Sequence, residues 1–595
     1  MLIGQLQKQL STPIKSLHSK RARFWLSLSL TFGFFYGYLG GLRPAFESNY
    51  IIQDDARQHV FWMLRFLDPD LFPNDLIADY FQSVAPLGYS YLYKFATFFG
   101  LNPIFFSKII PILLGLISTY YCYRLLLELF PIPTAGFIAT LLLNSSLWMR
   151  DDIASATPRA FMTPLFLAFM YYFVKRSLLP TLIVIALLGL FYPPYALVAG
   201  GVIALQLIRW KNGKITLTLS NKEYKFSAAS LGLVFLILLP FAFSLSEFDP
   251  VISVEQAKAL PEFYAGGRSA FFWENPWIYW LGGRGGLIPY TIFITPLLLL
   301  GLFLPLLLPF SQRFPLVQTV QLKTRILLDV MLVGLGLFFA AHLLLFKLHL
   351  PSRYTQYSLP IILSLAAAIA ITIALDSLLR WAQKPKQKWA GLRKGIALTT
   401  VTIFGLMIVA VYPTILKDSP QAFYIKGRHP ELYQFFAKHP KDILIASLTG
   451  ETDNLQSFAQ RSVFVSKEAA IPYHWGYYEK LRQRILDLIE AQYSPNLETV
   501  QIFIQKYGIN FWMIEQSSFM PAYLEAPTPD SLFEYFNTNH QSWLQQYQPA
   551  TQQAEQTLKQ GITPALAKTQ DTCTVLKTDG FTVLDANCIT NLTNL

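Results

Sequence analysis

Charged residues are scarce in this 595-residue chain, at 14% of all positions, whereas an ordinary soluble domain carries about a quarter. Hydrophobic residues make up 53% and aromatic residues 15%. Apolar runs long enough to cross a bilayer as helices recur along the first two thirds of the chain. The scarcity of charge therefore excludes a large soluble enzyme and predicts a polytopic α-helical membrane protein.

Acidic residues are fewer than basic ones, 36 against 48, which gives a formal net charge of +12. A basic chain can bind nucleic acid, but here the lysines and arginines concentrate in alternate loops between the apolar runs. This is the positive-inside pattern of membrane topology, so we expect no nucleic-acid partner. The pattern places segment 1–23 in the cytoplasm. We also expect the first span to remain uncleaved, because no small-residue cleavage site follows that span.

Cysteine is rare, with three residues in the whole chain. Cys122 lies inside an apolar run and is expected to serve packing only. Cys573 and Cys588 flank segment 574–587, which reads as two strands around an Asp-Gly hairpin signal. In an extracytoplasmic compartment this pair can form a disulfide across the hairpin. Two free thiols are the alternative, and the sequence leaves both open.

Eleven apolar runs are expected to span the membrane. They lie at about 24–42, 104–123, 132–148, 160–174, 178–191, 194–209, 228–246, 287–309, 326–346, 358–377 and 395–413. With the N-terminus inside, every lysine-rich loop falls on the cytoplasmic face. The loops on the outer face are then 43–103, 149–158, 247–286 and 347–357. Residues 24–413 thus form the predicted transmembrane domain of an integral, multi-pass membrane protein.

The tail, 414–595, differs in character from the rest. Short alternating apolar segments at 442–447, 462–465 and 510–514 read as strands, with helical stretches at 478–492 and 497–507. Such alternation of strand and helix predicts a small α/β domain, which the topology places outside the membrane. The glutamine-rich segment 543–560 is expected to be an exposed helix or linker.

Two adjacent aspartates, Asp54 and Asp55, follow the first apolar run, with Arg57 and His59 close behind. Charge beside a span is costly unless it faces water, a partner or a substrate. Capping of a helix expected at 56–67 explains at least one of the two carboxylates structurally. A role in chemistry is the other interpretation. His59 fits no zinc-ligand spacing and is more often a surface or structural residue.

A second acidic pair, Asp151 and Asp152, lies in the next outer loop, and Arg159 follows at the entrance of a span. Two such pairs at one membrane face favour a function over simple capping. Carboxylates grouped in this way can take a proton from an acceptor hydroxyl or hold a divalent cation against phosphate oxygens. Arginine complements them, because its rigid fork of donors matches the geometry of phosphate.

Two further outer loops carry charge among aromatic residues. Glu262 and Arg268 belong to the loop 247–286. The loop at 347–357 contributes four candidates, Lys347, His349, Arg353 and Tyr354. Arg353 stands at the start of a span, where a lipid phosphate would lie. Snorkelling of its guanidinium to the headgroups is an equally open interpretation.

These features together resemble the GT-C superfamily of membrane glycosyltransferases, which use polyprenyl-phosphate or polyprenyl-diphosphate sugars. The shared features are an acidic pair in the first outer loop, amphipathic segments along the membrane surface (61–76), a second outer acidic motif and a terminal extracytoplasmic α/β domain. The resemblance covers residues 24–413. The superfamily includes protein mannosyltransferases, aminoarabinose transferases and oligosaccharyltransferases. The W-W-D-x-G motif of oligosaccharyltransferases is absent from the sequence, which favours a single-sugar transferase.

The resemblance implies an inverting enzyme that transfers a sugar from a polyprenyl-phosphate donor to a hydroxyl of a glycan, lipid or protein. It implies that Asp54 or Asp55 is the catalytic base, with Asp54 slightly favoured. A divalent cation, Mg²⁺ or Mn²⁺, would lie on Asp54, Asp151 and Asp152, although adjacent aspartates replace the usual D-x-D motif and leave metal dependence open. The substrate-binding candidates are Arg57, His59, Asp151, Asp152, Arg159, Glu262, Arg268, Lys347, His349, Arg353 and Tyr354.

The expected setting is a bacterial inner membrane, with membrane lipids around the spans and the site on the outer face. Two other classes of function are open. One is a transporter or flippase of a lipid-linked or small polar solute, which inverted repeats and charges within the spans would favour. The other is a non-catalytic protein of similar architecture that acts through its soluble tail.

Overall fold

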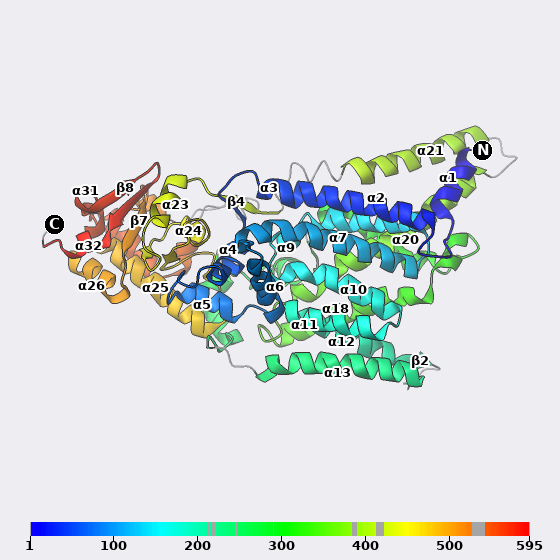
Figure 1. The fold of residues 1–595 in the computed structure, drawn as a ribbon, viewed down its shortest axis with the longest axis horizontal. Coiled ribbons are helices and arrows are strands. Elements are labelled where there is room, and N and C mark those ends of the chain that lie inside the picture. The colour runs from blue at the N-terminus through cyan, green and yellow to red at the C-terminus, as the bar shows by residue number, and fades with distance from the viewer. Residues whose placement is uncertain are drawn as a thin grey trace.

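The computed structural model describes residues 2–211, 214–216, 220–243, 247–289, 291–383, 389–411, 422–525 and 542–593. Long helices lie side by side at one end of the molecule, and a smaller part built on a mixed sheet lies at the other (Figure 1). The N-terminus is at the helical end and the C-terminus at the sheet end (Figure 1).

Helices cover the apolar runs that the sequence predicts as spans. They are α2 (Lys20–Gly37), α7 (Pro103–Leu129), α8 (Pro133–Leu147), α10 (Met162–Val174), α11 (Leu178–Phe191), α12 (Pro193–Leu207), α13 (Asn221–Phe243), η5 (Pro296–Phe303) with α17 (Leu304–Leu307), α18 (Arg325–Leu343), α20 (Ser358–Gln383) and α21 (Ala390–Leu406). Among the described residues, five stretches are long and apolar enough to cross a membrane: Pro103–Leu129, Asn221–Pro240, Leu322–Leu343, Ser352–Gln383 and Ala390–Val411. An integral membrane protein is thus supported, while the number of eleven crossings stays a prediction.

The stretch that contains α20 is the most enclosed of these five. Of its most apolar window, 83% is buried inside the protein, against 11% for the stretch that contains α21. Small residues allow this enclosure: a Cβ atom at Gly301 of η5 would lie 2.9 Å from the Leu363 carbonyl oxygen of α20. Other parts of the protein enclose α20. The short helix α19 (Ser352–Thr355) comes directly before α20 in the chain, so this enclosure also fixes its position.

The tail contains a five-stranded sheet with the order β6-β5-β7-β9-β8. Its strands are β5 (Leu444–Ala446), β6 (Ser462–Val463), β7 (Phe511–Glu515), β8 (Thr574–Lys577) and β9 (Phe581–Asp585). The first three strands in this order are parallel, and β9 runs antiparallel to both of its neighbours. Parallel strands need crossover connections, and α24 (Thr452–Phe458), α25 (Trp475–Tyr493) and α26 (Leu497–Tyr507) lie in these connections.

The first outer loop and the chain leading into the tail form one two-stranded ladder. β1 (Ile51–Gln53) pairs antiparallel with β4 (Tyr424–Lys426), so that Ile52 lies opposite Ile425. The Asp54 N–H extends this ladder by donating to the Phe423 carbonyl at 3.0 Å. Asp54, the first residue of the first acidic pair, therefore lies at the end of the β1–β4 ladder that connects the tail to the first outer loop.

Two segments differ from the sequence prediction. The helix expected at 56–67 is divided into α4 (Ala56–His59) and the 3₁₀ helix η2 (Phe61–Phe66). The start of segment 61–76 has its apolar side chains covered by the protein and not exposed for a membrane surface, because at most 2% of each residue is exposed at Phe61, Trp62, Met63 and Leu64. Segment 543–560 is not fully exposed either, since apolar neighbours cover Trp543, Leu544 and Tyr547. Other parts of the fold bury these apolar residues, and a local sequence pattern does not reveal such tertiary contacts.

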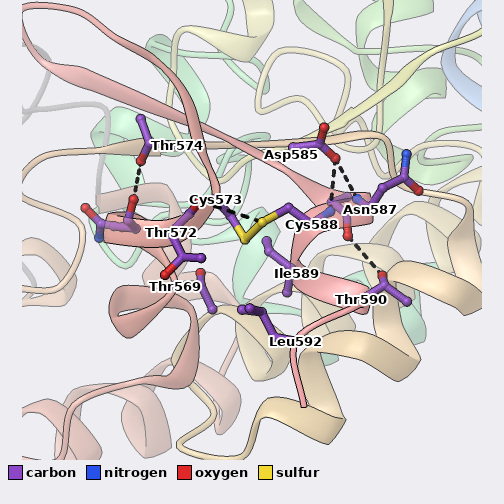
Figure 2. The surroundings of a disulfide bond; sticks show 12 residues. Thr569, Thr572, Cys573, Thr574, Asp585, Asn587, Cys588, Ile589, Thr590 and Leu592 are labelled. Atoms are coloured by element: carbon purple, nitrogen blue, oxygen red, sulfur yellow. Dashed lines mark hydrogen bonds between the residues drawn. A yellow bond between two sulfur atoms is a disulfide. The ribbon is translucent and has the colours of Figure 1, made fainter. Parts of the chain in front are cut away.

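Cys573 and Cys588 form a disulfide, with their Cα atoms 5.5 Å apart (Figure 2). The bond lies at the open end of the hairpin β8–β9, whose turn contains Gly580 at φ +99°. The Asp-Gly signal thus predicted the hairpin correctly, and the structure selects the disulfide from the two alternatives that the sequence left open. Cys122 is buried and free.

We expect one reactive thiol in the unreduced, denatured protein and three after reduction, because two of the three cysteines are bonded to each other. Thiol titration with a chromogenic reagent in denaturant measures this directly. Closing a loop of 15 residues stabilises the folded tail by about 3 kcal/mol, so the Cys573→Ser/Cys588→Ser variant should also melt at a lower temperature. Three reactive thiols without reductant would contradict the pairing.

Candidate functional site

The two aspartates of the first pair point to different surroundings. Gln53 fixes the backbone before them, since its side chain donates to the Ala422 carbonyl at 3.2 Å and accepts from the Ala56 N–H at 3.3 Å. Asp55 occupies the N-cap position of α4, but its side chain makes no capping hydrogen bond. The capping explanation therefore does not account for the Asp55 carboxylate, which is available for other contacts.

Asp55 meets both residues of the second acidic pair around one guanidinium. Arg159 Nη2 contacts the Asp55 carboxylate and lies 2.8 Å from Asp151 Oδ2, while its Nε lies 3.3 Å from Asp152 Oδ1. The four side chains are between 12% and 30% exposed, so water reaches them only in part. Asp55, Asp151, Asp152 and Arg159 are called the carboxylate–Arg159 cluster below.

A buried tryptophan holds the second acidic loop in place. Trp148 ends α8 and packs where a Cβ atom at Gly41 or Gly115 would come within 2.9 Å of its ring, so only glycine leaves room for it. Its indole N–H donates to Asn144 Oδ1 at 3.3 Å. The chain then turns into α9 (Asp151–Ala154), whose first turn carries both aspartates, and into η3 (Pro158–Phe161), which carries Arg159.

The cluster has an unusual electrostatic balance. Burial, followed by the neighbouring Asp152 carboxylate, raises the pKa of Asp151 to about 7. Asp55 Oδ2 and Asp152 Oδ1 are both buried, and their partner within the described structure is the Arg159 guanidinium, in contacts that lack hydrogen-bond geometry. Carboxylate oxygens in this state are costly to bury, which makes them candidates for contact with a substrate hydroxyl.

Two further arginines lie on the other side of Asp152. Arg150 Nε is 2.6 Å from Asp152 Oδ2, and its guanidinium lies over the Tyr357 ring at 4.9 Å. Arg353 lies over the same ring at 5.3 Å and donates to the Tyr357 hydroxyl. Among the described residues, Arg353 has no carboxylate within ion-pair distance, and its Nε is buried without a hydrogen-bond partner. The Arg353 guanidinium therefore has N–H donors that could bind an anion.

Asp54 belongs to a second group that joins the outer loops to the tail. Its carboxylate contacts Arg57, and Arg57 Nη1 donates to Asn454 Oδ1 at 3.0 Å. Glu468 follows, with Oε1 3.9 Å from Arg57 Nη2 and Oε2 2.5 Å from Arg268 Nη2. Asp54, Arg57, Arg268 and Glu468 are called the interdomain cluster below.

The structure does not bring the other candidates into either cluster. The His59 ring packs edge-on against Phe81, and burial lowers its pKa to about 4. Glu262 is fully buried and accepts from Tyr478 and Arg482 of the tail. The Tyr354 hydroxyl donates to the Leu348 carbonyl at 2.7 Å. The remaining two, Lys347 and His349, have exposed side chains.

Three residues near the clusters were not predicted from the sequence: Asn454, Glu468 and Tyr357. Asn454 and Glu468 follow β5 and β6 at their carboxyl ends, the edge at which open α/β sheets bind ligands. That position was the available signal for both. Tyr357 lies four residues after Arg353, the spacing at which two side chains meet on one helical face.

The predicted metal ligands are not assembled around one position. Asp54 is paired with Arg57 in the interdomain cluster, away from Asp151 and Asp152. The guanidinium of Arg159 lies among the other three carboxylates, where a cation would have to bind. Within the described part of the chain, no group of three or more His, Cys, Asp or Glu side chains is arranged to hold a metal ion. The described residues as placed do not fit the predicted divalent cation.

The raised pKa of Asp151 predicts a pH-dependent difference in stability. Between about pH 4 and pH 7 the folded protein holds a proton on Asp151 that the unfolded chain releases, so the wild type loses stability as the pH rises through this window. Asparagine cannot titrate. The melting temperature of the Asp151→Asn variant minus that of the wild type should therefore rise between pH 4 and pH 7 and level off above. A difference that stays flat would contradict the assignment.

No protein-family model matches the sequence, and neither does any curated protein. Solved structures do match. The apo crystal structure of the Archaeoglobus fulgidus oligosaccharyltransferase is similar with a TM-score of 0.53 at 12% identity, over 85% of this chain and 71% of that chain. The same enzyme tethered to an acceptor peptide gives a TM-score of 0.49 at 11% identity, over 90% and 72%. ArnT from Cupriavidus metallidurans gives 0.44 at 12%, over 95% and 98%.

At such low identities the likeness concerns the fold alone. The assignment of the fold rests on the apo oligosaccharyltransferase, whose TM-score is 0.53. The preference for a single-sugar transferase, which came from the missing W-W-D-x-G motif, stays a prediction. The chain has the fold of the Archaeoglobus fulgidus oligosaccharyltransferase, and five of its described stretches are long and apolar enough to cross a membrane. This likeness of fold agrees with the resemblance to membrane glycosyltransferases seen in the sequence.

Proposed function

We propose that this protein is a membrane glycosyltransferase that moves a sugar from a polyprenyl-phosphate donor to an acceptor hydroxyl of a glycan, lipid or protein. One observation carries the proposal: three carboxylates from two predicted outer loops meet at Arg159, beside Arg353, which pairs with no carboxylate among the described residues. Transfer with inversion needs a base for the acceptor and positive charge for the leaving phosphate. The two kinds of side chain lie together here.

Asp55 is the base in this proposal. The resemblance slightly favoured Asp54, but the Asp54 carboxylate pairs with Arg57 on the side of the tail. Asp55 faces the cluster instead, and its Oδ2 contacts Arg159 there without hydrogen-bond geometry. An acceptor hydroxyl bound there would donate its proton to Asp55 as its oxygen attacks the anomeric carbon of the donor.

Arg353 and Arg159 stabilise the leaving lipid phosphate. Arg353 begins the enclosed stretch Ser352–Gln383 and retains free donors. Arg159 contacts Asp55 within the cluster. Its positive charge would therefore lie close to the reacting atoms. As the bond to the sugar breaks, negative charge grows on the bridging phosphate oxygen, and fixed cations in a partly dry site stabilise it strongly.

The proposed setting is the outer face of a bacterial inner membrane. The charge distribution places the clusters and the tail there, and the disulfide of the tail is the kind of bond that persists in an oxidising compartment. A lipid-linked donor would reach the site from the bilayer between the spans.

The alternatives receive less support. A transporter is favoured by unpaired charge within the spans, yet Asp329 pairs with Arg325, four residues before it, and Asp376 pairs with Arg380, four residues after it. A protein acting only through its tail would not need the carboxylate–Arg159 cluster. Deleting the tail cannot separate that idea from catalysis, because the ladder β1–β4 connects the tail to Asp54.

The Asp55→Asn variant should lose about 10²–10⁴-fold in sugar transfer, the range for removing a positioned general base. Asp54→Asn should lose less, because Asp54 acts only through Arg57. The assay incubates purified protein with a panel of polyprenyl-phosphate sugars, with and without a chelator, and measures released lipid phosphate.

Asp79→Asn is the matched control, since Asp79 lies in the same outer loop and pairs with Arg65 outside both clusters. It should transfer sugar at the wild-type rate. Undiminished transfer by Asp55→Asn would refute the base assignment, and absence of transfer by the wild type across a broad panel would refute the proposed function.

The Arg353→Lys variant keeps the charge but loses the planar fork of donors. We expect kcat/KM for the donor to fall by about 10²-fold, in line with the loss of one oxyanion donor. Arg325→Lys is the control, because Arg325 begins α18 and pairs with Asp329. Equal kcat/KM for the Arg353→Lys variant and the wild type would contradict the role in phosphate binding.

A further inference from the structure

Glu468 of the tail lies where three parts of the chain meet. From the first outer loop, Gln58 Nε2 donates to its Oε2 at 2.8 Å, and Arg57 lies 3.9 Å from its Oε1. From the loop at 247–286, Arg268 Nη2 lies 2.5 Å from its Oε2. Arg268 also donates to the backbone carbonyls of Lys467 and Glu468, both at 3.2 Å.

The turn that carries Glu468 is itself fixed. It follows β6 at the carboxyl end of the parallel strands, where Asp453 Oδ1 accepts from the Glu468 N–H at 3.1 Å and from the Ser466 hydroxyl at 2.6 Å. Burial alone would raise the pKa of Glu468, but the Arg268 and Arg57 guanidiniums outweigh it and lower the pKa. Glu468 is therefore an ionised carboxylate on a rigid support.

The contacts of Glu468 lead directly to α4. Gln58 and Arg57 are adjacent residues of this four-residue helix, and Asp55 is its N-cap. So short a helix has little stability of its own, so the direction of the Asp55 carboxylate depends on what holds α4. On the near side the ladder β1–β4 holds the chain up to Asp54. On the far side Glu468 anchors α4 through Gln58 and Arg57, and Asn454 adds a hydrogen bond to Arg57.

We propose that Glu468 is a positioning residue for sugar transfer: it anchors α4 so that Asp55 points at Arg159. This inference rests on the proposed function. It assigns a part in the reaction to the tail, since a carboxylate of the sheet domain sets the geometry of a base in the first outer loop. Glu468 itself touches no reacting atom in this account.

General docking of the tail is the competing explanation, and the chain offers a control for it. Lys441 of the tail lies 2.6 Å from Asp68 Oδ2 of the first outer loop, in a contact outside both clusters. Both side chains are more than a third exposed, at 42% and 36%. The Lys441→Met variant therefore removes a contact between the same two parts without touching α4.

The experiment compares full-length wild type, Glu468→Gln, Gln58→Ala and Lys441→Met. The rate of sugar transfer gives kcat and KM for the donor, and hydrogen exchange of the backbone at 51–59 reports the anchoring of α4 without any turnover. Glu468→Gln should lower kcat by about 10–100-fold, as for lost supporting contacts to reactive groups, with KM for the donor unchanged and exchange at 51–59 faster. Gln58→Ala should change both quantities in the same direction, and Lys441→Met should change neither.

The two readouts separate the inference from the function on which it rests. If the wild type transfers no sugar but Glu468→Gln speeds exchange at 51–59, the proposed function fails and the anchoring of α4 stands. If the wild type transfers sugar but neither Glu468→Gln nor Gln58→Ala alters kcat or exchange, the inference is overturned. It is also overturned if Lys441→Met lowers kcat as much as Glu468→Gln. Should Glu468→Gln fail to fold, Gln58→Ala and Lys441→Met decide the question.

Discussion

The structure depends on one ion-pair centre, the guanidinium of Arg159 among the carboxylates of Asp55, Asp151 and Asp152. Three partly buried carboxylates would repel one another without it. Arg150 and Arg353 bring the number of nearby guanidiniums to three, so positive and negative side chains balance in number. Within the part of the chain that the structure describes, Arg353 nevertheless has no carboxylate within ion-pair distance. A site of this kind is neutral enough to fold and still presents donors to an anion on one side and a carboxylate acceptor on the other.

The tail is part of the same construction. The ladder β1–β4 and the interdomain cluster hold the segment around Asp55 from both ends, so the sheet domain and the first outer loop form one unit. Glu262 adds a further buried contact, with Arg482 and Tyr478 of the tail. These contacts join the tail to the first outer loop across the division that composition suggests near residue 414.

Patterns of hydropathy and charge predicted much of this architecture, because the length of a span and the sign of a loop are local properties. They placed the helices of the membrane part, the strands of the tail and the hairpin of Cys573 and Cys588. They also drew attention to both acidic pairs and to Arg159 and Arg353. They could not decide between Asp54 and Asp55, whose directions depend on contacts with residues some 400 positions away, such as Glu468. The buried position of η2 and the occupation of the expected metal position by Arg159 escaped prediction for the same reason.

The most direct test of the central claim is an experimental structure of the protein with a polyprenyl phosphate bound. We expect the phosphate to lie against the Arg353 guanidinium, on the side of the carboxylate–Arg159 cluster, with Asp55 facing the space that the sugar would fill. A phosphate bound elsewhere, or one that reaches the interdomain cluster and leaves Arg353 without a ligand, would contradict it.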